Sequence, residues 1–125
     1  MPNVAPRSRG FDLDVDILII GAGACGLTAA LAAREATGPD ATILVLERDL
    51  SPSGSTSLSS GFIPAADTAM QRAAGVADSP ALLAQDIQAK AHGKAHEPLV
   101  QRVAAESGPA ISWLHEAHGL PFILI

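Results

Sequence analysis

The chain has 125 residues, of which 48% are hydrophobic and 17% charged, a balance that suits one ordinary domain and excludes intrinsic disorder. Its formal charge of −5 disfavours a nucleic-acid partner held through phosphate contacts. A single Cys excludes an internal disulfide and a cysteine metal cluster.

Two stretches of the sequence bear on export and on membrane insertion. The first sixteen residues contain Arg7 and Arg9 but no apolar segment of the kind found in export signals. We therefore expect a cytoplasmic protein whose residues 1–13 form a flexible N-terminus. The longest apolar stretch, from Ile17 to Ala33, is interrupted by glycines and flanked by charges, so we expect no membrane span.

The first half of the chain predicts a strand, a helix and a second strand. The apolar run from Asp16 to Ile20 is typical of a strand buried in the middle of a parallel sheet. A helix from Ala24 to Thr37 is closed by Gly38-Pro39, and the run from Thr42 to Leu46 predicts another strand. This order predicts a βαβ unit of an α/β, Rossmann-like fold, followed by helices.

The second half predicts mainly helices. Asp78-Ser79-Pro80 predicts the start of a helix that runs through about residue 94. Glu97-Pro98 predicts a second helix, which ends near Glu106. Ser107-Gly108-Pro109 predicts the start of a third, which Gly119 ends in the left-handed conformation.

The last residues, from Leu120 to Ile125, predict a final strand. A strand of this apolar type needs neighbours on its edges, and the chain offers few other strands. We therefore expect residues 14–125 to be the N-terminal part of a larger domain.

A glycine motif, Gly21-Ala22-Gly23-Ala24-Cys25-Gly26, lies between the first strand and the first helix. Gly21 permits a tight turn, Gly23 lets a diphosphate approach the main chain, and Gly26 allows the helix to pack close to its strand. Free amides at the start of the helix then face the anion. The alternative is that these glycines only tighten the turn.

Glu47 lies 21 residues after Gly26, at the end of the second predicted strand. A carboxylate at this place accepts hydrogen bonds from both ribose hydroxyls of an adenosine and repels a 2′-phosphate, which disfavours NADP. The alternative is a solvated charge at a strand end.

Cysteine and histidine residues suggest two further kinds of site, neither of which we expect. Cys25 has no second Cys to pair with, so it is predicted to be a small side chain in the turn. His92 and His96, like His115 and His118, have helical spacing but lack a third ligand, so we expect solvated histidines and no metal.

Three stretches carry a resemblance to a known family: DILIIGAGACGLTAALAA, ILVLER and SGSTSLSSGFIPAADT. Together they resemble the start of the flavoprotein subunits of fumarate reductases, succinate dehydrogenases and 3-ketosteroid dehydrogenases. The resemblance extends over residues 14–125, through Asp78-Ser79, Glu97-Pro98 and Ser112-Trp113-Leu114.

The resemblance implies FAD as the cofactor. It implies that the pyrophosphate is held by main-chain groups of Gly21, Gly23, Cys25 and Gly26, and the ribose by Glu47, with Arg48 also in the cofactor site. It places a further set of residues along the pyrophosphate, ribityl chain and flavin ring: Gly54, Ser55, Thr56 and Gly61. The alternative for this serine-rich stretch is a disordered linker.

Two residues depart from the family pattern, because Ser53 and Phe62 stand where the family usually has glycine. Relatives with a covalent flavin carry a histidine in this loop, whereas this chain has Ser and Thr, so we expect noncovalent FAD. A row of small hydroxyl groups can bind a polar cofactor without excluding it sterically.

The function implied is that of an FAD-dependent oxidoreductase that reduces or forms a C=C bond next to a carbonyl or carboxylate of a small-molecule substrate. No catalytic residue is assigned in this chain, which we expect to be inactive alone. An NAD-binding domain of a dehydrogenase and a truncated product without turnover remain as alternatives.

Overall fold

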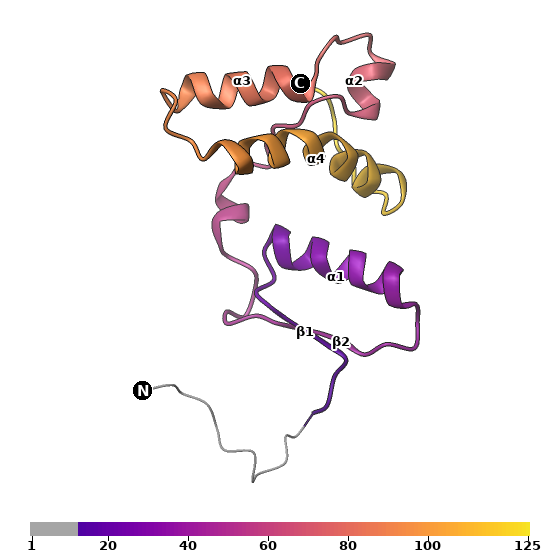
Figure 1. Cartoon of the computed structure of the whole chain (residues 1–125). Helices are drawn as coiled ribbons and strands as arrows, with labels where there is room; N and C mark the ends of the chain where they lie inside the picture. Colours follow the sequence, from indigo (N-terminus) through magenta and orange to yellow (C-terminus); the bar gives the residue numbers. More distant parts are fainter. Residues whose placement is uncertain (1–12) are drawn as a thin grey trace. The chain divides into compact units, whose positions relative to one another are not determined.

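The computed structural model describes residues 13–125 (Figure 1). The predicted flexible N-terminus, residues 1–13, lies outside this range except for the exposed Leu13. The chain divides into two compact units after Phe62, and each is described by itself. We call residues 13–62 unit 1 and residues 63–125 unit 2.

Unit 1 contains the predicted βαβ unit. Strand β1 (Ile17–Ile20), helix α1 (Ala24–Thr37) and strand β2 (Ile43–Leu46) follow one another, and the two strands pair in parallel. Each strand begins one residue later than predicted. The two residues predicted to begin the strands, Asp16 and Thr42, instead bond to each other just before the paired residues. The Asp16 carboxylate accepts the Thr42 N–H at 2.8 Å.

The two faces of the β1–β2 sheet differ. On one face, α1 lies against the strands, and the Ile19 side chain approaches Gly26 of α1. On the other face, Leu18 is 51% and Ile20 82% exposed. The prediction that β1 is buried on both faces is therefore wrong for the described residues, whose sheet has two strands and a helix on one side.

Unit 2 is helical, with α2 (Ala69–Ala73), α3 (Pro80–Lys90) and α4 (Glu97–Glu116). The Ser79 hydroxyl accepts the Leu82 N–H at 3.1 Å, which confirms the predicted start of α3. This helix ends four residues earlier than predicted, since His92 and Gly93 adopt left-handed backbone conformations.

The core of unit 2 lies between α3 and α4. Small and branched apolar side chains form it: Ala84, Val100 and Ala104, with Leu83, Ile87 and Ala95 around them. Small side chains at this seam let the two helix backbones approach closely.

Helix α4 is continuous where the sequence predicted two helices. Pro109 lies inside it, and the predicted start signal does not interrupt it. The Ser107 hydroxyl bonds back to the Ala104 carbonyl, which is helical rather than capping geometry. Gly108 is required by a close approach of the Ala66 carbonyl, because a Cβ there would lie 2.0 Å from that oxygen.

The C-terminal residues also differ from the prediction. Gly119 is left-handed as predicted (φ 67°), and its N–H donates to the His115 carbonyl. The predicted strand from Leu120 to Ile125 is wrong, since none is present among residues 13–125 after β2. An apolar run forms a strand only when a neighbouring strand accepts its hydrogen bonds, and within this range none does.

Candidate dinucleotide-binding site

The turn between β1 and α1 is built around two glycines. Gly21 has a φ of 97°, and its N–H donates to the Leu46 carbonyl of β2 at 2.7 Å. A Cβ on Gly26 would lie 1.9 Å from the Gly21 carbonyl oxygen. The predicted tight turn and close helix packing are therefore both present, and neither tolerates a larger residue.

The start of α1 presents amide groups. Gly23 is the N-cap and contributes no side chain of its own. Within the described residues, no acceptor is bound to the N–H groups of Gly23, Cys25 and Gly26. These amides, at the positive end of the helix dipole, suit a diphosphate. A Cβ on Gly23 would contact only the Thr56 hydroxyl, at 3.7 Å, so this glycine is not required by the protein's own packing.

Glu47 follows β2 directly, and the parallel pairing brings its carboxylate to the glycine turn. One carboxylate oxygen accepts the Ala22 N–H at 2.7 Å, and the other accepts the N–H groups of Arg48 at 2.8 Å and Asp49 at 3.1 Å. The bonds from Ala22 and Asp49, with a smaller effect from Arg48, lower the pKa of Glu47 below its ordinary value. The carboxylate is therefore ionised at neutral pH.

Thr56 connects the serine-rich stretch to the same turn. It lies in a short 3₁₀ helix, η1 (Ser55–Leu58), and its hydroxyl accepts the Ala24 N–H at 3.1 Å across 32 residues of sequence. Hydroxyl groups of Ser57 and Ser59 bond back to main-chain carbonyls of the same stretch. These residues are thus ordered by specific contacts, contrary to the disordered-linker alternative.

The expectation of free amides at the start of α1 needs a correction. The N–H groups of Ala22 and Ala24 are held by the protein's own Glu47 and Thr56. Sequence reasoning missed both bonds because they join residues far apart in the chain. No local pattern at the glycine motif signals them.

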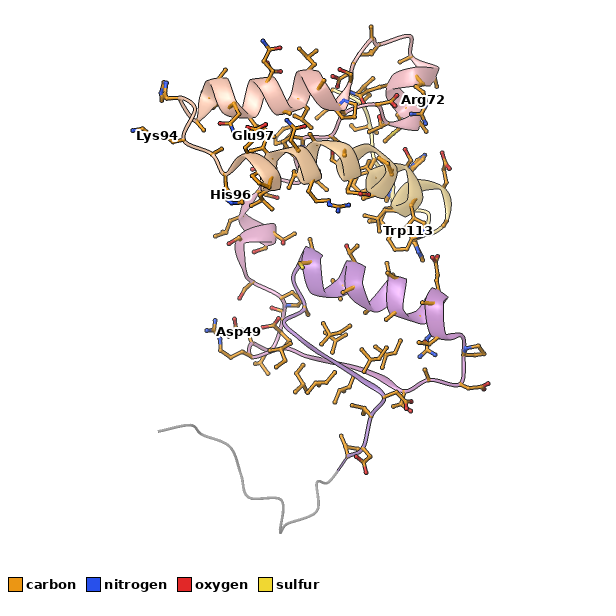
Figure 2. The ribbon with its side chains drawn as sticks, in the orientation of Figure 1. Asp49, Arg72, Lys94, His96, Glu97 and Trp113 are labelled. Atoms are coloured by element: carbon orange, nitrogen blue, oxygen red, sulfur yellow. The ribbon has the colours of Figure 1, made fainter. Side chains whose placement is uncertain are left out.

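The remaining predicted site residues all lie in unit 1. Cys25 is exposed in the first turn of α1, and Gly54 and Ser55 are exposed at the start of η1. Gly61 is left-handed, with a φ of 78°. The Arg48 side chain is 89% exposed and pairs at 3.1 Å with Asp49, which is labelled in Figure 2.

Two of the four histidines are exposed, as predicted, but they do not lie on a helix face, and the other two are half-buried. His92 and His96 lie in the connection between α3 and α4. The ring of His115 contacts the Leu120 carbonyl at 2.8 Å, and His118 packs edge-on against Trp113. No group of three possible metal ligands is found in residues 13–125.

Comparison with known families assigns most of the chain to one family. Residues 16–124 match the FAD binding domain family. The chain belongs to this family. The match, together with the βαβ unit, confirms the α/β FAD-binding fold and the resemblance to fumarate reductase flavoproteins.

The chain is similar in sequence to part of several curated proteins, three of which are reductases. The chain is 32% identical over 112 residues to an NADH:fumarate oxidoreductase of Klebsiella pneumoniae, covering 90% of this chain and 11% of that protein. It is 33% identical over 107 residues to an acrylate reductase flavoprotein subunit of Shewanella woodyi, covering 86% and 21%. It is 30% identical over 111 residues to a urocanate reductase of Eggerthella lenta, covering 89% and 18%.

The chain thus spans about a tenth to a fifth of the length of these relatives. It is similar to one part of each of these relatives. Within residues 13–125, none of the helices combines the length and the hydropathy that a bilayer span requires.

Proposed function

We propose that this chain binds FAD noncovalently and forms the cofactor-holding part of an oxidoreductase. The observation that carries the proposal is the bond between the Glu47 carboxylate and the Ala22 N–H, which puts an ionised acid beside the glycine turn. This is the arrangement that an adenosine diphosphate group requires, with sugar hydroxyls at the acid and phosphates at the amides.

The residues fit the cofactor in their chemistry. Main-chain N–H groups of Gly23, Cys25 and Gly26 would hold the pyrophosphate, and Glu47 would accept the ribose hydroxyls. When bound, FAD supplies two-electron transfer to and from the substrate. Small exposed residues would line the remainder of the cofactor with hydroxyls and bare backbone: Gly54, Ser55, Thr56 and Gly61. Arg48, which follows Glu47 in the chain, would belong to the same site through its charged side chain.

The proposed reaction is reduction or formation of a C=C bond next to a carbonyl or carboxylate. The relatives support this class, because fumarate, acrylate and urocanate are all carboxylates with an adjacent C=C bond. This chain's own residues would bind and orient the flavin, and we assign none of them to proton transfer. Turnover would then depend on other parts of the complete protein.

The test is a titration of the purified chain with FAD and, in parallel, with NAD. We expect quenching of flavin fluorescence and a yellow protein after gel filtration, and no comparable response to NAD. The contact between Thr56 and Ala24 supports FAD over NAD, because it gives the serine-rich stretch a place at the cofactor site. Binding of NAD but not FAD, by both the chain and the complete protein, would refute the proposal.

A further inference from the structure

The turn that follows β2 is held by side chains as well as by the strand pair. Glu47 receives the Ala22 N–H on one carboxylate oxygen and the N–H groups of Arg48 and Asp49 on the other. Two successive peptide groups therefore point at one oxygen, which fixes the course of the backbone directly after the strand.

Asp49 carries these contacts one step further along the chain. Its carboxylate accepts hydrogen bonds from Nε and Nη2 of Arg48 at 3.2 and 3.1 Å, and from the Ser53 hydroxyl at 3.0 Å. The bond from Arg48, and then the bond from Ser53, lower the pKa of Asp49 below its ordinary value. The acceptor is thus ionised at neutral pH, which strengthens the bond from the hydroxyl. We call this bond between Ser53 and Asp49 the clasp.

The clasp closes a short loop that has few other contacts. Leu50, Ser51 and Pro52 lie inside this loop and are exposed, and none of them makes a hydrogen bond to another of the described residues. Without the clasp, the first hydrogen bond after Asp49 would be made at Gly54, five residues later. The clasp is therefore the contact that limits, from the β2 side, where the next ordered element can lie.

That next element, η1, reaches the glycine turn. Gly54 is its N-cap, and the Gly54 carbonyl accepts the Ser57 N–H at 3.0 Å and the Ser57 hydroxyl at 2.7 Å. Thr56 in the same short helix accepts the Ala24 N–H. The residue that makes the clasp thus lies directly before the residues that contact the start of α1.

Taken together, these contacts form a closed ring within unit 1. The ring runs from Ala22 to Glu47, through Asp49 and the clasp to η1, and from Thr56 back to the start of α1. Glu47 and Thr56 belong to the candidate site, whereas the two side chains of the clasp lie outside it. A ring that is closed in the free protein already lacks the freedom that an open loop would lose when a ligand binds.

We propose that Ser53 is a positioning residue for the flavin cofactor. Its bond to Asp49 holds the start of the serine-rich stretch, from Gly54 to Thr56, near the glycine turn before FAD binds. Less conformational entropy is then lost on binding. This inference rests on the proposed function, since it concerns the same cofactor. The side chains of Ser53 and Asp49 do not touch the cofactor in this proposal.

The test is a double-mutant cycle in the complete natural protein, with FAD affinity measured by fluorescence titration. Ser53→Ala removes the donor of the clasp, and Asp49→Ala removes its acceptor. We expect Ser53→Ala to weaken FAD binding about threefold when Asp49 is present and to have no effect in the Asp49→Ala background. The loss of the Arg48 pair does not enter this comparison, because both Asp49→Ala proteins share it.

Two further variants separate the clasp from a general effect of changing the loop. Ser53→Thr keeps the hydroxyl and should bind FAD like wild type. Ser51→Ala makes the matched change at an exposed serine outside the clasp, and it should also bind like wild type.

The outcomes distinguish this inference from the proposed function. Equal FAD affinity in wild type and Ser53→Ala, or an equal loss from Ser53→Ala with and without Asp49, overturns the positioning role and leaves the proposed function intact. If the wild-type protein itself binds no FAD, the proposed function fails first and this inference fails with it.

Discussion

The two units place their residues by different means. In unit 1, the candidate site depends on backbone geometry: a left-handed glycine, a helix start too close for a Cβ, and parallel strands that deliver Glu47 to the turn. Among residues 13–62, which are the described part of unit 1, Ala22 is the only buried apolar residue. In unit 2, by contrast, position depends on buried side chains such as Ala66 and Ala104. It also depends on the buried Gln71 amide, which accepts the Thr68 N–H and donates to the Ala65 carbonyl and the Asp78 carboxylate. The candidate site therefore depends on accurate peptide geometry more than on a large local core.

The largest expected effect tests the backbone side of this comparison. Gly26→Ala places a Cβ 1.9 Å from the Gly21 carbonyl oxygen, so α1 must shift away from β1 and carry its amides with it. We expect FAD affinity, measured by fluorescence titration, to fall by about 100-fold. Ala32→Ser on the exposed part of α1 is the control and should bind normally. Wild-type affinity in Gly26→Ala would mean that the close packing is dispensable.

The next effect tests the side-chain packing of unit 2. Gly108→Ala brings a Cβ to 2.0 Å from the Ala66 carbonyl oxygen, so the segment of residues 65–69 must shift away from α4. Such a shift strains the hydrogen bonds that Ala66 and Ala69 donate to Ser107 and Ser112. We expect the free energy of unfolding to drop by about 1–3 kcal/mol, measured by thermal or urea denaturation. Ala105→Ser, at an exposed position of the same helix, should unfold like wild type. If Gly108→Ala were equally stable, the close contact would not constrain the segment.

A smaller effect concerns the charge of Glu47. Hydrogen bonds from Ala22 and Asp49 lower its pKa from 4.5, so the group stays ionised at mildly acidic pH. Its contribution to stability is present above the unfolded pKa and is lost as the pH falls through the lower, folded value. We expect Glu47→Gln to weaken FAD binding about tenfold at pH 7 and to remove the loss of binding that otherwise occurs as the pH falls through the lowered pKa of Glu47. An acid loss that persists unchanged in Glu47→Gln would assign it to other groups.

The smallest effect concerns the Thr56 hydroxyl. Thr56→Val keeps the shape of the side chain but leaves the Ala24 N–H without its acceptor, whereas Thr56→Ser retains the hydroxyl. We expect about threefold to tenfold weaker FAD binding in the valine variant and near-normal binding in the serine variant, by titration calorimetry. Equal binding by both variants would show that the cap is unimportant for the cofactor.

Much of unit 1 could be predicted from sequence because its signals are local. The helix from Ala24 to Thr37 has the predicted bounds, and both strands differ by one residue. The glycine spacing predicted the turn and the packing correctly, because Gly21 is required by its own backbone conformation and Gly26 by a neighbour a few residues away.

The errors arise where a distant partner decides the structure. Ser107-Gly108-Pro109 looks like a helix start, yet Gly108 is needed for the Ala66 carbonyl, 42 residues earlier, and α4 continues through Pro109. The bond between Glu47 and the Ala22 N–H likewise depends on strand register. Nothing near any of these residues in the sequence carries that information.

Helix α1 obtains its cap from outside itself, since Gly23 has no side chain and Thr56 supplies the acceptor for Ala24. During translation, Thr56 leaves the ribosome 32 residues after Ala24. The amino end of the first helix is therefore completed only when the serine-rich stretch has been synthesised and has folded back onto it. Until then, that end is held by water alone and is the place where a nascent chain would fray.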